Sequence, residues 1–142
     1  ILPAMRPTTA AENATLLFMR LIVGAVFIYA GLAKWFIWSG PLPGMEGLMI
    51  PLTKLLSIAE PLGGAALILG LLARWAAAGL AIIMTGSLYF VYVLFQAGIF
   101  TSEKGTGMDY NLLLLAGNMM LLVFGPGDWT VDSLRRSASG RR

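Results

Sequence analysis

Four runs of hydrophobic residues, separated by short polar or turn-forming stretches, dominate the pattern of this chain. They span about residues 14–38, 51–72, 75–97 and 110–124. A bilayer core about 30 Å thick needs roughly 20 apolar residues at about 1.5 Å each, so we interpret each run as a transmembrane helix, the fourth being the shortest. The pattern predicts an all-α integral membrane protein, a four-helix bundle in which successive helices run antiparallel.

The polar stretches outside these runs divide the chain into three parts. Residues 1–13 form an N-terminal segment, residues 14–126 the helical domain, and residues 127–142 a basic tail that is either a short helix or disordered. A cleavable signal peptide is the alternative for the first run, because residues 31–33 have the small side chains of a cleavage site. We favour a helix, because the run is too long for a signal peptide and contains Arg20.

Arginine and lysine predict the topology, because the cytoplasmic flanks of membrane helices are enriched in both. Seven basic residues fall on one side of the predicted bundle and three on the other: Arg6, Arg20, Arg74, Arg135, Arg136, Arg141 and Arg142 against Lys34, Lys54 and Lys104. We therefore expect both termini on the cytoplasmic side of a prokaryotic plasma membrane. The arginines of the tail are expected to touch anionic lipid.

Composition excludes several classes of function. The chain is 58% hydrophobic and 12% charged, and its net charge of +3 is scattered, which argues against nucleic-acid binding. It contains no histidine and no cysteine. Thiol catalysis, iron–sulfur clusters, histidine-ligated haem and imidazole zinc sites are thereby excluded, and we expect no metal site. A redox role would need a diffusible cofactor or one held by a partner.

Charged residues within the predicted helices are the first candidates for a site, since each costs about 2.5–3.5 kcal/mol at the bilayer centre and usually faces a partner. Arg20 and Lys34 are 14 residues apart, so they share one face of the first helix. The rise per residue places Glu60 between their levels. We expect Glu60 to pair with one of them, either as a structural ion pair or as part of a ligand site. Pro61 should kink the helix there, or a capping box at residues 57–60 begins a new segment.

A second group of polar residues occupies the third and fourth helices. Its members are the ligand-site candidates Tyr89, Tyr92 and Gln96, which continue a stripe from Thr85, and Asn111 and Asn118. Counted by helical rise, Glu60, Tyr89 and Asn118 fall at a similar depth. The functional interpretation is a polar pocket between the helices; the alternative is interhelical hydrogen bonding and ordinary packing of tyrosine.

Glycines recur at seven-residue spacing in three of the predicted helices. The pairs are Gly24 with Gly31, Gly63 with Gly70, and Gly79 with Gly86. Seven residues are nearly two helical turns, so each pair marks one face where another backbone can approach closely. We expect these faces to pack within the bundle, or one of them to form a homo-oligomer.

These features together resemble the DoxX family of small four-helix membrane proteins, related to DoxD and to the SURF4-like group. The resemblance runs from the first helix to the tail and is carried by Arg20-Leu21, Gly24, Phe27, Gly31 and Lys34, by residues 60–64 (Glu-Pro-Leu-Gly-Gly), by Leu67, Gly70, Arg74, Ala76 and Ala77, and by residues 125–127 (Gly-Pro-Gly) with Asp132. It implies a four-helix bundle. Many relatives carry a histidine near the end of the third helix, where this chain has Tyr92 and Gln96, so no histidine-dependent activity carries over.

The resemblance also implies a function, because members are associated with thiosulfate:quinone oxidoreductase, terminal-oxidase gene clusters and oxidative-stress complexes. We therefore expect a membrane subunit of a quinone-linked oxidoreductase or redox complex, with quinone as the diffusible cofactor and other membrane subunits as partners. Tyr89, Tyr92 and Asn118 are the expected quinone ligands, and Glu60 and Lys34 the proton-exchanging groups. The alternatives are an accessory structural subunit and an oligomeric small-molecule transporter.

Overall fold

A computed structural model describes residues 8–93, 96, 98–102 and 107–139. In this part of the chain all regular elements are helical and no strand is present. The helices are α1 (Ala10–Ala33), the 3-10 helix η1 (Trp35–Trp38), α2 (Met49–Leu69), α3 (Ala73–Val93), α4 (Asp109–Phe124) and α5 (Val131–Ser139). The all-α prediction is confirmed, and the tail contains a helix.

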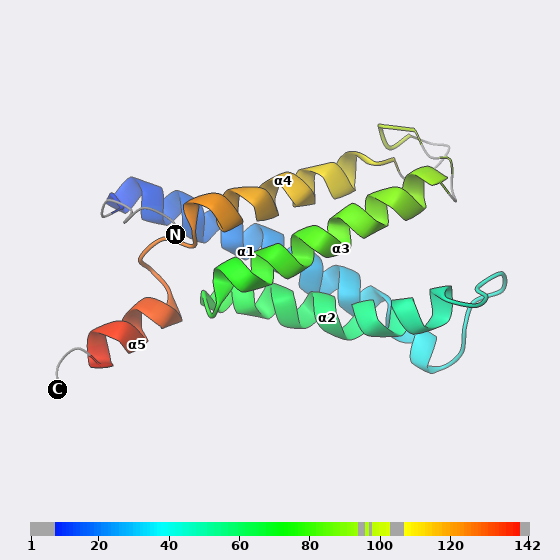
Figure 1. Cartoon of the computed structure of the whole chain (residues 1–142), viewed down its shortest axis with the longest axis horizontal. Helices are drawn as coiled ribbons and strands as arrows, with labels where there is room; N and C mark the ends of the chain where they lie inside the picture. Colours follow the sequence, from blue (N-terminus) through cyan, green and yellow to red (C-terminus); the bar gives the residue numbers. More distant parts are fainter. Residues whose placement is uncertain (1–7, 94–95, 97, 103–106, 140–142) are drawn as a thin grey trace.

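Three stretches of helix are long and apolar enough to cross a membrane: Ala10–Trp38, α2 and α3. The helix α4 is apolar but shorter, as its hydrophobic run indicated. Figure 1 shows α1 to α4 side by side. At one end of the bundle α1 begins, α2 turns into α3, and α5 is found; we call this the tail end. We call the opposite end the loop end.

The helix α1 begins at a capping box and stops earlier than its apolar run. The hydroxyl of Thr9 accepts from the Glu12 N–H, and the Glu12 carboxylate accepts from the Thr9 N–H, which satisfies two otherwise unpaired amides. At the other end the chain tightens from α-helix to η1 after Lys34. The predicted single helix to residue 38 is therefore two elements.

Close backbone contact joins α1 to α2. The carbonyl oxygen of Gly64 lies 2.6 Å from the position that a Cβ on Gly24 would take, and a Cβ on Gly31 would lie 2.1 Å from Pro61 Cδ. Any side chain at either glycine would push the two helices apart. Because later residues of α1 meet earlier residues of α2, the two helices run in opposite directions.

Pro61 lies inside a continuous α2, with Ser57 in the same helix upstream of it. The predicted capping box at residues 57–60 is therefore wrong: the Ser57 hydroxyl donates to the carbonyl of Lys54 in the preceding turn. The proline ring faces Gly31 of α1. Because proline has no N–H to donate to the Ser57 carbonyl, this carbonyl accepts instead from the indole N–H of Trp35.

The turn between α2 and α3 is short because Gly70 caps α2 in the left-handed conformation, with φ +68°. It returns the chain so that Leu80 of α3 packs over Gly63. Phe27, Leu67 and Leu121 are almost completely buried and join α1, α2 and α4 in one apolar core. The core thus fills the middle of the bundle.

The helix α3 ends at Val93, earlier than the predicted residue 97. Gln96 lies beyond it with φ +46°, so it is not part of the polar stripe on this helix. Part of the stretch between the third and fourth predicted helices lies outside the described residues, as do Arg6, Lys104, Arg141 and Arg142.

Candidate functional site

A buried ion pair joins α1 to α2 near the loop end. The ammonium of Lys34 lies 2.5 Å from Glu60 Oε2, and it also donates to the carbonyl of Ala30 at 3.0 Å. The Glu60 side chain is 3% exposed and that of Lys34 is 29% exposed. The carboxylate is therefore enclosed, whereas the lysine side chain is the partly exposed member of the pair.

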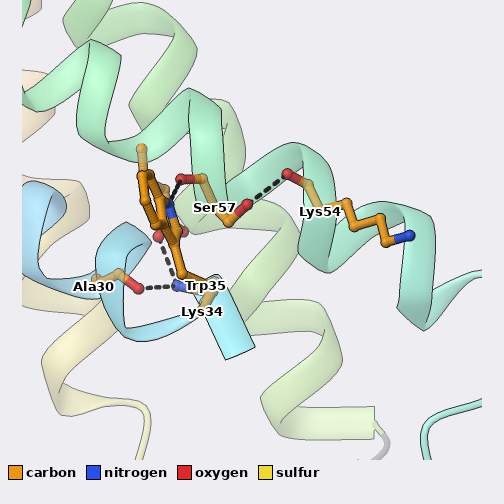
Figure 2. A network of polar contacts seen from close by, with 6 residues as sticks. Ala30, Lys34, Trp35, Lys54 and Ser57 are labelled. Atoms are coloured by element: carbon orange, nitrogen blue, oxygen red, sulfur yellow. Dashed lines mark hydrogen bonds and ion pairs between the residues drawn. The ribbon is translucent and has the colours of Figure 1, made fainter. Parts of the chain in front are cut away.

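Two tryptophans of the α1–α2 connection fix the surroundings of this pair. The indole N–H of Trp35 donates to the carbonyl of Ser57 at 3.0 Å, and that of Trp38 donates to the Ser57 hydroxyl at 3.1 Å. Figure 2 shows Lys34, Trp35 and Ser57 meeting where α1 ends against α2. The ammonium of Lys54 lies 5.3 Å from the centre of the Trp38 ring, a cation–π contact. These contacts hold η1 against α2 and so fix the backbone that carries Lys34.

Polar groups from α1 and α4 complete this end of the bundle. Tyr110, in the first turn of α4, lies within electrostatic range of both Glu60 and Tyr29. It is 44% exposed, while its neighbour Asn111 is buried. Lys34, Glu60 and Tyr110 therefore form one polar region at the loop end, which we call the loop-end site.

Arg20 is not part of this site: of the two cations expected as partners of Glu60, only Lys34 pairs with it. Its guanidinium is buried and donates to the carbonyls of Pro126 and Trp129, each at 2.8 Å. Arg20 and Lys34 share a face but are separated by about 21 Å along the helix, and Glu60 reaches only Lys34. Arg20 instead ties α1 to the segment between α4 and α5.

The expected quinone ligands do not converge on the loop-end site. Tyr89 and Tyr92 are each 64% exposed, on the open face of α3. Asn118 is fully buried, and its amide N–H donates to the Leu114 carbonyl of its own helix at 2.8 Å. Its Oδ1 has no partner among the described residues. Equal depth along the helices did not bring these side chains together, because they point to different sides.

The glycine faces have two different environments. Gly24, Gly31 and Gly63 lie at contacts between helices, and a Cβ on Gly70 would lie 2.6 Å from Thr130 Cβ. No atom of another residue lies within 4 Å of the Cβ position at Gly79 or Gly86, within the described structure. The expected packing inside the bundle is therefore absent for this third pair, and its oligomer alternative stays untested.

Comparison with known proteins identifies the family. Residues 15–93, from α1 to the end of α3, match the DoxX family. The chain belongs to the DoxX family. The match includes Lys34, Glu60 and the glycine contacts between α1 and α2, so the ion pair lies within the part of the chain that defines this DoxX protein.

Two curated relatives align with most of this DoxX chain. The uncharacterized membrane protein Rv3486 of Mycobacterium tuberculosis is 34% identical over 138 residues, covering 87% of this chain and 85% of its own length. The inner membrane protein YqjF of Escherichia coli is 29% identical over 133 residues, covering 87% of this chain and 93% of its own. No solved structure matches this DoxX protein.

Sequence reasoning missed the contacts that hold the tail end of this DoxX protein together. Asp128 accepts from the Thr8 hydroxyl at 2.5 Å, and its backbone N–H donates to the Asn13 side chain at 2.7 Å. The Leu72 N–H donates to the Asp132 carboxylate at 2.6 Å. In the sequence these residues are isolated polar positions near glycines and prolines. Their spacing did not indicate which of them would form hydrogen bonds with one another. Among the described residues no cluster of three acidic, His or Cys residues is placed to hold a metal ion.

Proposed function

We propose that this DoxX protein is a membrane subunit of a quinone-linked redox complex and contributes the loop-end site rather than a redox centre. The observation that carries the proposal is the Lys34–Glu60 pair, in which a partly exposed lysine side chain holds an enclosed carboxylate. Charged groups at membrane depth are costly, and they mark functional sites by default. The lack of histidine and cysteine supports leaving the redox centre to a partner.

The proposal includes a topology in which the four helices cross the bilayer antiparallel, with both ends of the chain in the cytoplasm. The arginine-rich tail end supports the cytoplasmic assignment of that end. The loop-end site then opens toward the extracytoplasmic side of a prokaryotic plasma membrane. The Escherichia coli relative, described as an inner membrane protein, supports the choice of membrane.

The residues of the loop-end site fit a quinone through hydrogen-bond donors. Lys34 is a donor whose side chain is partly exposed, and Tyr110 carries a phenolic hydroxyl within electrostatic range of Glu60. Both groups can donate to a carbonyl oxygen of the ring. Glu60 holds the ammonium in place, and it can exchange a proton with Lys34 across their hydrogen bond. A bound quinone would supply the two-electron chemistry that these side chains lack.

The test is the quinone content of the purified protein. Protein extracted in mild detergent should carry more quinone per mole than an unrelated four-helix membrane protein prepared in parallel. Lys34→Met and Tyr110→Phe should lower that content, whereas Tyr89→Phe, on the open face of α3, should not. Quinone at the background level in the wild type, with no oxidoreductase co-purifying, would contradict the proposal.

A second candidate, an accessory subunit that docks onto a larger membrane complex, is favoured by the open glycines of α3. Gly79 and Gly86 leave room for a neighbouring helix along a face that also exposes Trp75 and Ile82. Gly79→Leu with Gly86→Leu should then remove co-purifying subunits without lowering thermal stability. The transporter alternative has less support, because Phe27 and its apolar neighbours fill the middle of the bundle.

A further inference from the structure

An open hollow of about 860 Å³ lies at the tail end, at the opposite end of the molecule from the loop-end site. The start of α3, the end of α4 and the helix α5 enclose it. Ligand sites in proteins commonly measure about 300–1,000 Å³, so the hollow has room for a polar group of ordinary size. Its position is independent of the proposed quinone site.

The charges around the hollow favour an anion. Its walls carry Arg74, Arg135 and Arg136 against Asp128 and Asp132. Both carboxylates are engaged within the chain, Asp132 by the Leu72 N–H and Asp128 by Thr8. Asp128 also lies within electrostatic range of Arg136 and offsets part of its charge. The wall arginines outnumber the aspartates by one.

Arg20 adds a further positive charge behind the wall. It donates to the carbonyl of Pro126, a residue that lines the hollow, and has no carboxylate partner among the described residues. Because Arg20 is 1% exposed, its charge is poorly screened by solvent. The hollow therefore faces a net positive region with a buried component.

The hollow is held open by contacts that fix α5. Thr130, just before α5, lies against Gly70, and Asp132 in its first turn accepts from the Leu72 N–H. The carbonyl of Trp129 accepts from Arg20. These contacts come from α1 and from the turn between α2 and α3, so the arginines of α5 are carried by a positioned helix.

The apolar groups beside the hollow indicate where it lies relative to lipid. Trp75, which lines it, is 78% exposed, and Trp129 at the same end is 51% exposed. Leu134 on α5 is 70% exposed, next to the exposed Arg135 and Arg136. Exposed tryptophans at the end of membrane-spanning helices, with a short basic amphipathic helix, are typical of the headgroup region of a bilayer.

We propose that this hollow binds the phosphate of an anionic phospholipid headgroup, with Arg135 and Arg136 of α5 as its donors and Arg74 of α3 adding positive charge to its wall. The phosphate would accept from the guanidinium groups, while Trp75 and Leu134 lie beside the acyl chains. Such a lipid would join α5 to the membrane-spanning helices.

Native mass spectrometry of the whole chain in detergent, with equal amounts of phosphatidylglycerol and phosphatidylcholine added, tests this site. The wild type should retain phosphatidylglycerol in preference. Arg135→Gln with Arg136→Gln should lower its retention about 30-fold, since each arginine near an anionic headgroup contributes about fivefold. Lys54→Gln, which removes a charge at the loop end, is the matched control and should change nothing. Arg135→Lys with Arg136→Lys should restore most of the preference.

Three results would overturn the assignment. Equal retention of the two lipids by the wild type would show that the hollow does not select an anion. If the wild type, the Gln variant and the Lys variant all retain the same amount of phosphatidylglycerol, the arginines of α5 do not bind the headgroup. Displacement of phosphatidylglycerol by millimolar inorganic phosphate would assign the site to free phosphate rather than to lipid. The quinone content of the same samples reports separately on the loop-end site.

Discussion

Lys34 at the end of α1 and Glu60 of α2 form an ion pair whose Nζ–Oε2 distance is 2.5 Å. The pair joins the two helices at the point where Pro61 packs against Gly31. A charge pair and a close helix contact thus occupy the same level, so each depends on the other. Moving the helices apart would lengthen the ion pair, and losing the pair would leave a charge at a tight interface.

The ion pair predicts a strong coupling between its two residues. Glu60→Ala should lower the free energy of unfolding by about 3 kcal/mol, the low end for a broken buried pair because Lys34 is partly exposed. Adding Lys34→Met should recover part of that loss, because no unpaired cation remains. Thermal unfolding in detergent of both single variants and the double variant measures the coupling. Additive effects of the two substitutions would show that the pair contributes nothing. Glu46→Ala, which removes an exposed carboxylate outside the pair, is the control.

The glycine contacts predict that substitution at Gly64 and at Gly86 has opposite consequences. A Cβ at Gly64 would lie 2.5 Å from the carbonyl oxygen of Gly24, so Gly64→Ala should destabilise by about 1–3 kcal/mol. Gly86→Ala meets open space and should be neutral, or stabilising by up to about 1 kcal/mol, since alanine favours the helix. Melting temperatures of the two variants in one detergent test this. Equal destabilisation at both positions would mean that α3 is also packed on this face.

The hydrogen bonds of Arg20 predict that the segment after α4 depends on this residue to stay attached to the bundle. Arg20→Met leaves the carbonyls of Pro126 and Trp129 without their donor, and each hydrogen bond to a charged group is worth about 1.5–3 kcal/mol. We expect the segment after α4 to detach, with faster proteolysis between Gly125 and Leu134. Arg135→Gln, on the exposed face of α5, should leave the cleavage rate unchanged. A tail equally resistant in the Arg20→Met protein would show that other contacts hold it.

Asp128 predicts an acid dependence at the tail end. Hydrogen bonds from Thr8 and Asn13 lower the pKa of its carboxyl below the ordinary value of 3.8. A carboxyl with a lowered pKa in the folded state stabilises the protein fully above the unfolded value, and this contribution is lost as pH falls through the folded value. Stability should therefore decrease as pH falls below about 4. Asp128→Asn should flatten that decrease, measured by melting temperature against pH. An identical slope in the variant would assign the acid dependence to other carboxyl groups.

The proposed topology predicts the accessibility of single cysteines, for which the chain offers a background free of native cysteine. A cysteine at Gly44, in the connection between α1 and α2, should react with a membrane-impermeant reagent applied from outside intact cells. A cysteine at Ser137, in α5, should react only after the membrane is opened. The reverse pattern would place the tail end outside and overturn the topology.

The helices could be predicted from the sequence because lipid imposes a simple requirement on it. A segment that spans a bilayer must satisfy its own backbone hydrogen bonds and carry about 20 apolar residues, which hydropathy reveals directly. The membrane character and the all-α class followed from this. The length of α3 did not, because the apolar run was predicted to stay helical to residue 97, whereas Gln96 is not helical.

The sequence by itself also determined that Glu60 needs a cation, since an unpaired carboxylate at that depth is too costly. Only the tertiary structure decided which cation pairs with Glu60. Lys34 and Arg20 lie on one face of α1 at different levels, and Glu60 of α2 meets that face at the level of Lys34. Helical spacing fixes the face and depth of a side chain, but the rotation of each helix about its axis depends on packing. That rotation placed Tyr89 and Tyr92 on the open face of α3. Their depth had suggested that they lie beside the ion pair, but they do not.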